Sequence, residues 1–205
     1  GTFVRMGRTK KIRALNNISL SIKKGDVVAL IGKNGAGKST LLKVISGMIR
    51  PSEGTVLSKG RVILLAGVNP GFSGELSGKR NVTELAPAYG IKSEDIDLFV
   101  KSVIEFADIG DAIDRRVKGY SSGMKGKLGF GFITALNPDI LLIDETLGVG
   151  DEEFRLKAQK RLRDFVNKSG SVIMSTHSLG LARELCNRGI VLDNGEIISD
   201  DEIEN

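Results

Sequence analysis

Residues 27–40 read VVALIGKNGAGKST, and this stretch decides the fold. Its start, Val27–Ile31, is a short apolar run rich in β-branched residues, which predicts a buried strand. From Gly32 to Ser39 the chain matches the pattern G-x-x-x-x-G-K-[ST] in full, and Lys38–Ile45 reads as a helix. A strand, a glycine-rich loop and a helix in this order are the context that a phosphate-binding P-loop requires. A glycine-rich turn with a surface lysine is the plain alternative, and the flanking elements argue against it.

The P-loop residues have distinct expected parts in holding a nucleotide. Glycines let the backbone turn its N–H groups inward, and the N-terminus of the following helix adds positive potential for phosphates. Lys38 is expected to reach the β- and γ-phosphates, and Ser39 is expected to ligate Mg²⁺. The residues predicted to contact the nucleotide here are Gly32, Asn34, Gly35, Ala36, Gly37, Lys38, Ser39 and Thr40.

Polar side chains follow two further predicted strands. Asp144 and Glu145 come directly after the apolar run 140–143, and His177 follows the run 171–175. Because the carboxyl ends of parallel strands meet at the edge where ligands bind, we expect these side chains to converge on the P-loop. Asp144 is predicted to hold Mg²⁺, Glu145 to polarise an attacking water, and His177 to sense the γ-phosphate. The alternatives are two acids that merely end a strand and a structural histidine.

The rest of the chain alternates strands and helices, which indicates an α/β core with a parallel sheet. Apolar residues at helical spacing from Ile96 to Ala107 predict an amphipathic helix with Ser93 as its N-cap. This helix lies in a predicted helical insertion over about residues 80–120 of a single domain that spans residues 1–205. Further strands are expected over 55–57 and 61–65, further helices over 122–136, 152–168 and 179–187, and a hairpin from 190–192 to 196–198 through Asn194-Gly195.

The composition excludes several classes of protein. The 205 residues are 40% hydrophobic and 27% charged, which is ordinary for a globular domain. No apolar run approaches the ~18–20 residues that span a bilayer, and no apolar signal-peptide segment follows the basic start. One cysteine excludes an intrachain disulfide, and one histidine excludes a multi-histidine metal site. The net charge of +5 has its densest cluster between Arg5 and Arg13, where no aromatic residue follows Phe3, so we expect a solvated edge and no nucleic-acid partner.

The stretch Tyr120-Ser121-Ser122-Gly123-Met124 is by itself an ordinary helix cap. With the P-loop, Asp144-Glu145, Gly148-Val149-Gly150-Asp151 and His177 in this order, however, the chain resembles the nucleotide-binding domain of ATP-binding cassette (ABC) transporters from about Ile12 to Ile198. The residues that follow the signature turn and Asp151 look like the polysaccharide-export branch of that family, which serves teichoic acid, O-antigen and capsular polysaccharide exporters.

The resemblance implies a fold and a mode of action. The fold is a P-loop NTPase core with a parallel sheet, flanking antiparallel strands and a small helical subdomain. The implied cofactors are ATP and Mg²⁺, and the implied species is a homodimer. In it, Ser121, Ser122 and Gly123 of one subunit, together with Asp151, contact the nucleotide held by the other. The resemblance also implies an integral-membrane permease as partner and a peripheral place on the cytoplasmic face of the membrane, with no membrane span in this chain.

The sequence departs from the family pattern in three places. Leu65-Ala66-Gly67-Val68-Asn69 lacks the family's glutamine, so we expect the segment Ala66–Phe72 to couple to the membrane partner through Phe72 rather than to complete the Mg²⁺ shell. The family's first strand is missing, which suggests a truncated start, and Phe3 is the aromatic residue expected to stack on adenine. The chain ends soon after Ile198, without the carbohydrate-binding domain of some O-antigen exporters, which favours a capsule or teichoic acid type.

The leading hypothesis is therefore the ATPase subunit of a polysaccharide exporter. A non-transport cassette ATPase that acts on nucleic acid or the ribosome would use the same chemistry, but such proteins usually carry two cassettes or long coiled-coil insertions. A P-loop kinase would need neither the signature turn nor His177.

Overall fold

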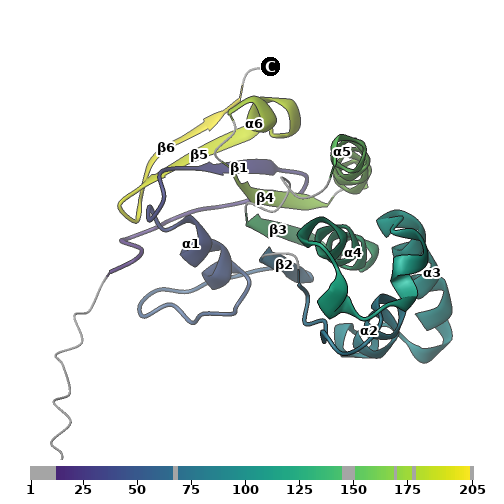
Figure 1. Ribbon diagram of the computed structural model, residues 1–205. Coiled ribbons are helices and arrows are strands. Elements are labelled where there is room, and N and C mark those ends of the chain that lie inside the picture. The colour runs from purple at the N-terminus through teal and green to yellow at the C-terminus, as the bar shows by residue number, and fades with distance from the viewer. Residues whose placement is uncertain (1–12, 67–68, 145–150, 169, 177–178, 204–205) are drawn as a thin grey trace, which may run out of the picture.

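Six strands form one sheet in the computed structural model, which describes residues 13–66, 69–144, 151–168, 170–176 and 179–203 (Figure 1). Their order across the sheet is β2-β3-β4-β1-β5-β6. All neighbouring pairs are parallel except β5 and β6, which form an antiparallel hairpin. The strands are β1 (Val27–Ile31), β2 (Val62–Ala66), β3 (Ile140–Asp144), β4 (Ser171–Ser175), β5 (Arg188–Asp193) and β6 (Glu196–Glu202).

Strand β1 lies inside the sheet between β4 and β5, although both of these strands come from the last quarter of the chain. Its five residues are apolar, as a strand with helices on both faces requires. The register aligns Leu30 of β1 with Ser175 of β4, and Ser175 in turn with Asp144 of β3. Three strands therefore end at one edge of the sheet, and the P-loop begins there.

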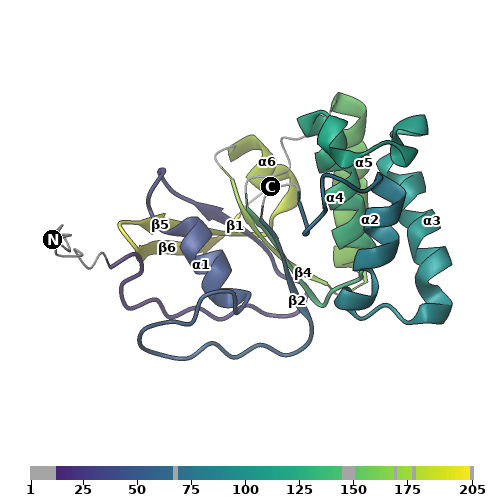
Figure 2. The ribbon, with the colours of Figure 1, turned by 60° about the horizontal axis from the view of Figure 1, so that its bottom comes forward.

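Helices cover both faces of the sheet (Figures 1 and 2). Alternate residues of each strand point to opposite faces, so Val28 and Leu30 pack with α1 while Val27 and Ala29 belong to the core under α4, α5 and α6. The helices are α1 (Lys38–Ile45), α2 (Gly78–Leu85), α3 (Ile96–Ala107), α4 (Ser122–Ala135), α5 (Glu152–Asn167) and α6 (Leu179–Leu185). Short 3-10 turns lie at Pro87–Tyr89, Ser93–Asp95, Gly110–Asp114 and Val117–Gly119.

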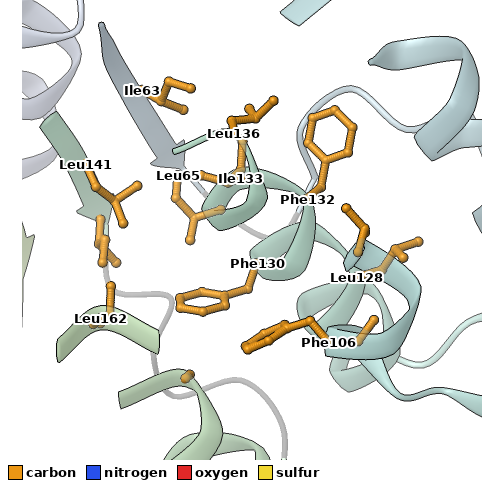
Figure 3. Close-up of a cluster of buried hydrophobic side chains, with 14 of the residues drawn as sticks. Ile63, Leu65, Phe106, Leu128, Phe130, Phe132, Ile133, Leu136, Leu141 and Leu162 are labelled. Carbon is orange, nitrogen blue, oxygen red and sulfur yellow. The ribbon is translucent and has the colours of Figure 1, made fainter. Parts of the chain in front are cut away.

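Helix α4 is the buried centre of the second face. Figure 3 shows Ile133 and Leu136 beside Ile63 and Leu65 of β2, and Phe130 on the side of α5. A further aromatic residue of α4, Phe132, makes edge-to-face contacts with Phe72, Tyr89 and Phe99, at ring-centroid distances of 5.7, 5.2 and 5.2 Å. These edge-to-face contacts tie α3 and the loops around α2 to the sheet.

Most of the predicted elements are confirmed, and two expectations are wrong. Residues 55–57 form no strand, because no described segment pairs with their backbone, and Leu57 is 94% exposed. Ser93 is not the N-cap of α3: a 3-10 turn occupies 93–95, and Asp95 takes the cap position. In the part of the chain that the structure describes, no helix is both long and apolar enough to cross a membrane.

The aromatic cluster gives a stability prediction. Phe132→Ala should lower the free energy of unfolding by about 3–5 kcal/mol, because it removes a fully buried ring and leaves a cavity. Urea denaturation measures the change. The matched control is Leu98→Ala on α3, where the side chain is 71% exposed and the cost should stay within about 0.5 kcal/mol. A loss below about 1 kcal/mol for Phe132→Ala would show that this ring does not anchor the helices.

Candidate functional site

The P-loop is a tight backbone turn between β1 and α1. Gly37 takes the N-cap position of α1 with a left-handed φ of 108°. A side chain there would also lie 2.8 Å from the Ala14 carbonyl oxygen, so only glycine fits on both counts. Within the loop, the Ala36 N–H donates to the Lys33 carbonyl at 3.1 Å. The predicted strand, loop and helix therefore fold as expected.

Lys38, the first residue of α1, curls back over the loop. Its ammonium donates to the carbonyls of Gly32 at 2.7 Å and Lys33 at 3.1 Å, and the residue is only 6% exposed. Both partners are neutral, so they fix the position of the charge without cancelling it. The arrangement suits an anion that carries several negative charges, such as a nucleotide phosphate chain.

Asp144 links three elements at the edge of the sheet. Its Oδ1 atom accepts hydrogen bonds from Ser39 Oγ of α1 at 3.0 Å and from Ser175 Oγ of β4 at 2.8 Å. The sequence predicted that Ser39 and Asp144 would meet, and the structure brings them together. A carboxylate and a hydroxyl are hard oxygen ligands, and Mg²⁺ takes one or two such ligands and keeps several waters. This donor set fits Mg²⁺.

Ser175 is a residue of the site that the sequence reasoning missed. It is buried at the carboxyl end of β4, directly beside Asp144 in the register of the sheet. A serine that ends an apolar strand matches no sequence motif. The available signal was positional, because a polar residue ending a strand next to an acidic strand end must share that edge.

Several expected site residues lie outside the described residues. These are Phe3, Glu145 and His177, together with Gly148–Gly150. Their neighbours are described: Glu145 directly follows Asp144, and His177 directly follows Thr176, whose N–H donates to the Leu30 carbonyl of β1 at 3.3 Å. The roles of Glu145, His177 and Phe3 stay predictions.

The signature turn begins helix α4. Ser121 is its N-cap and accepts a hydrogen bond from the Met124 N–H at 3.2 Å, while Ser122 and Gly123 form the first turn. The preceding Tyr120 is buried and donates its hydroxyl to the Ala112 carbonyl at 2.5 Å. Burial raises the pKa of Tyr120 above its ordinary value. Ser121 and Ser122 themselves are exposed, at the end of a helix on the opposite face of the sheet from α1.

Asp151 has a structural role besides the predicted nucleotide contact. It is the N-cap of α5 through the Phe154 N–H at 2.8 Å, and it pairs with Lys127 of α4 at 2.6 Å. The hydrogen bond from Lys127 is the largest cause that lowers the pKa of Asp151. Lys127 Nζ also lies 5.5 Å from the centroid of the Phe154 ring. This pair ties the signature helix to the start of α5, and its contact with nucleotide stays a prediction.

The loop after β2 corrects an expectation. Phe72 is not an exposed anchor for a membrane partner: it is 7% exposed and packs against Phe132. Asn69 agrees with the other half of the expectation, that this loop does not complete the Mg²⁺ shell: its Oδ1 accepts the N–H groups of Gly71 and Phe72, and its Nδ2 donates to the Phe72 carbonyl. The sequence alone could not reveal the burial of Phe72, since an aromatic residue in a glycine-rich loop has the same local pattern whether it points inward or outward.

Comparisons with known proteins agree with this geometry. A family model described as ABC transporter matches residues 15–148. The O-antigen export system ATP-binding protein RfbB of Klebsiella pneumoniae is 39% identical over 185 residues, which cover 90% of this chain and 75% of that protein. The teichoic acids export ATP-binding protein TagH of Listeria monocytogenes is 42% identical over 90% of this chain, but only 55% of that protein is covered.

Solved structures share the fold. The dimeric structure of a post-hydrolysis state of the ATP-binding cassette MJ0796, bound to ADP and Pi, has a TM-score of 0.82 at 23% identity and covers 98% of this chain and 95% of that one. A structure described as the ATP binding subunit of an ABC transporter has the same TM-score at 25% identity, over 93% of this chain and 84% of that one.

The Ser175 hydrogen bond gives a prediction about metal binding. Ser175→Ala should weaken the binding of Mn²⁺, a spectroscopic substitute for Mg²⁺, to the ADP-bound protein by about 10-fold or more, because partners of metal ligands typically contribute ~10–100-fold. Electron paramagnetic resonance measures the bound ion. The control is Ser171→Ala, a buried serine at the other end of β4. Equal effects of the two changes would contradict a role for Ser175 in positioning Asp144.

The Lys127–Asp151 pair gives a prediction about titration. By NMR, Asp151 should titrate below the ordinary value of about 3.9, and Lys127→Met should raise its pKa toward that value. Because the pKa is lowered in the folded chain, the stabilisation by the pair is complete above the ordinary pKa and is lost as the pH falls through the lowered one. Wild-type and Lys127→Met chains should therefore converge in stability at low pH. An Asp151 pKa that is the same in both chains would show that the pair does not persist in solution.

Proposed function

This chain belongs to the ABC transporter family, and from that premise we propose that it is the ATP-hydrolysing subunit of an exporter for a cell-surface polysaccharide of the O-antigen, teichoic acid or capsule type. The observation that carries the ATPase is the edge of the sheet where Lys38, Ser39 and Asp144 meet. Support for the polysaccharide comes from RfbB, an O-antigen export ATP-binding protein, and TagH, a teichoic acids export ATP-binding protein, both of which this chain matches over 90% of its length. It spans 75% and 55% of the length of those two proteins.

In the proposed mechanism, the P-loop and the first turn of α1 bind the phosphates of ATP, and Lys38 directs its charge toward the β- and γ-phosphates. Ser39 and Asp144 would hold Mg²⁺, which, when bound, neutralises charge on the phosphates. Glu145 accepts a proton from the attacking water, and His177 contacts the γ-phosphate. Each of these groups lies at or after the carboxyl end of β1, β3 or β4 in the sequence.

We propose further that two copies of the chain form each working unit. Ser121, Ser122 and Gly123 begin a helix on the opposite face of the sheet from α1, and the two serines are exposed. A second copy can therefore present them to this P-loop, and Asp151 would lie in the same interface. Hydrolysis would separate the copies and pass the motion to an integral-membrane permease at the cytoplasmic face of the membrane.

Replacing the proposed base tests the ATPase. Glu145→Gln keeps the shape of the side chain but cannot accept the proton, so hydrolysis should fall by about 10²–10⁴-fold. ATP should still bind and hold the dimer closed, which size-exclusion chromatography with and without ATP would show. The matched control is Glu153→Gln, an exposed glutamate in the first turn of α5, which should retain full activity. A Glu145→Gln chain with hydrolysis within a few-fold of wild type would contradict the assignment.

The transported substrate needs a cellular test. In a strain that lacks its own copy, the wild-type chain should restore polysaccharide at the cell surface, and Glu145→Gln should leave lipid-linked polysaccharide inside. An ATPase that is stimulated by RNA or ribosomes, with no effect on surface polysaccharide, would instead indicate a non-transport cassette protein.

A further inference from the structure

The tip of the β5–β6 hairpin lies against the P-loop (Figure 2). Two independent contacts join them. The Gly195 N–H, in the turn, donates to the Ala36 carbonyl of the P-loop at 2.9 Å. At the other side of the turn, the Leu192 carbonyl oxygen lies only 2.2 Å from where a Cβ of Gly32 would be. The hairpin is thus in backbone contact with the first glycine of the P-loop and with the residue just before the last one.

The bond from Gly195 fixes the direction of a P-loop donor. The Ala36 carbonyl and the Gly37 N–H belong to one planar trans peptide, so they point in opposite directions. Because the Ala36 carbonyl points toward the hairpin and accepts the Gly195 N–H, the Gly37 N–H is turned away from the hairpin. Without this bond the Ala36–Gly37 peptide could rotate, which would aim a carbonyl dipole instead of an N–H at a bound phosphate.

A third segment completes the contact. The Asn16 N–H donates to the Gly195 carbonyl at 2.8 Å, so both backbone groups of Gly195 are used. The Ala14 carbonyl oxygen lies 2.7 Å from the Cβ position of Gly195 and 2.8 Å from that of Gly37. Gly195 also has a left-handed φ of 82°. The chain segments at 14–16, 36–37 and 194–195 therefore meet so closely that neither residue 37 nor residue 195 has room for a side chain.

We propose that Gly195 is a positioning residue of the nucleotide site: its N–H holds the Ala36–Gly37 peptide so that the Gly37 N–H faces the phosphates. The proposal rests on the proposed ATPase function. It assigns to the Asn194-Gly195 turn a part in nucleotide binding that the motif residues do not supply. The turn acts through the backbone of Ala36 and touches no nucleotide itself.

An amide-to-ester replacement tests the bond directly. The single cysteine, Cys186, allows residues 186–205 to be made synthetically and joined to residues 1–185 by native chemical ligation. Glycolic acid in place of Gly195 removes the N–H and changes no side chain; the ester carbonyl of residue 194 also becomes a weaker acceptor, an effect that the control below shares. The matched control is the corresponding ester at Ile203, which removes one N–H of the same hairpin that donates to the Asn187 carbonyl at 3.0 Å, at its far end.

The expected result is a loss of nucleotide affinity specific to residue 195. By calorimetry, the ester at 195 should bind ADP about fivefold to tenfold more weakly than the ligated all-amide chain, and the ester at 203 should bind within twofold of it. The melting temperatures of the two esters without nucleotide should fall by similar amounts, because each has lost one backbone hydrogen bond. If the two esters lose similar stability but only the ester at 195 loses ADP affinity, Gly195 positions the nucleotide site. A purely structural role would lower the affinity of both esters equally.

A second pair of variants keeps the test open if an ester chain does not fold. Gly195→Ala adds a methyl group 2.7 Å from the Ala14 carbonyl, whereas Gly54→Ala imposes the same strain, at φ 83°, in open space. Gly195→Ala alone should weaken ADP binding. Equal ADP affinity in the all-amide chain and in the variants at 195 would overturn the inference and leave the proposed function intact. An all-amide chain that binds no ADP would refute the proposed function, and the inference with it.

Discussion

The parallel pairing of β1 with β4 and β5 is the constraint on which the rest of the structure depends. Parallel neighbours all run the same way, so β1, β3 and β4 end at one edge of the sheet. The P-loop follows β1, while Asp144 and Ser175 end the next two strands. The hydrogen bonds that Asp144 accepts from α1 and β4 are therefore a consequence of topology. Ser39 and Asp144 are 105 positions apart in the sequence, yet the correct order of the strands is sufficient to bring them together.

The second face of the sheet depends on α4. This helix reaches the sheet through Ile133 and the α2–α3 region through Phe132. The loop after β2 is attached to helix α2, because the Asn81 side-chain amide accepts the Ser73 N–H and donates to the Ser73 carbonyl. The signature turn begins α4, so it belongs to the same packed unit as the loop after β2. Packed side chains and hydrogen bonds thus connect the two segments.

Local patterns were sufficient wherever one segment determines its own structure. The run Val27–Ile31, the glycine-rich loop and the helix after it could be predicted because the strand, the loop and the helix start each have their own sequence signal. Predictions failed where a partner decides the outcome. Residues 55–57 have strand-forming composition but no partner strand among the described residues, and Phe72 is buried in the core, where Phe132 lies beside it. Ser175 escaped notice for the same reason, since its role exists only through its register with Asp144.

The P-loop shows how far such partner effects extend into the site itself. The motif identifies the residues that permit the turn. A buried peptide group, however, has both an N–H and a carbonyl, and each of them needs a hydrogen-bond partner. The Gly195 N–H of the hairpin satisfies the Ala36 carbonyl, and the segment at 14–16 is bonded to the same turn through the Asn16 N–H and the Gly195 carbonyl. A residue of any type other than proline has these backbone atoms. The sequence therefore shows only a glycine at the position where close contact leaves no room for a side chain. A motif of this kind therefore describes half of a binding site, and the other half becomes visible only when the chain is folded.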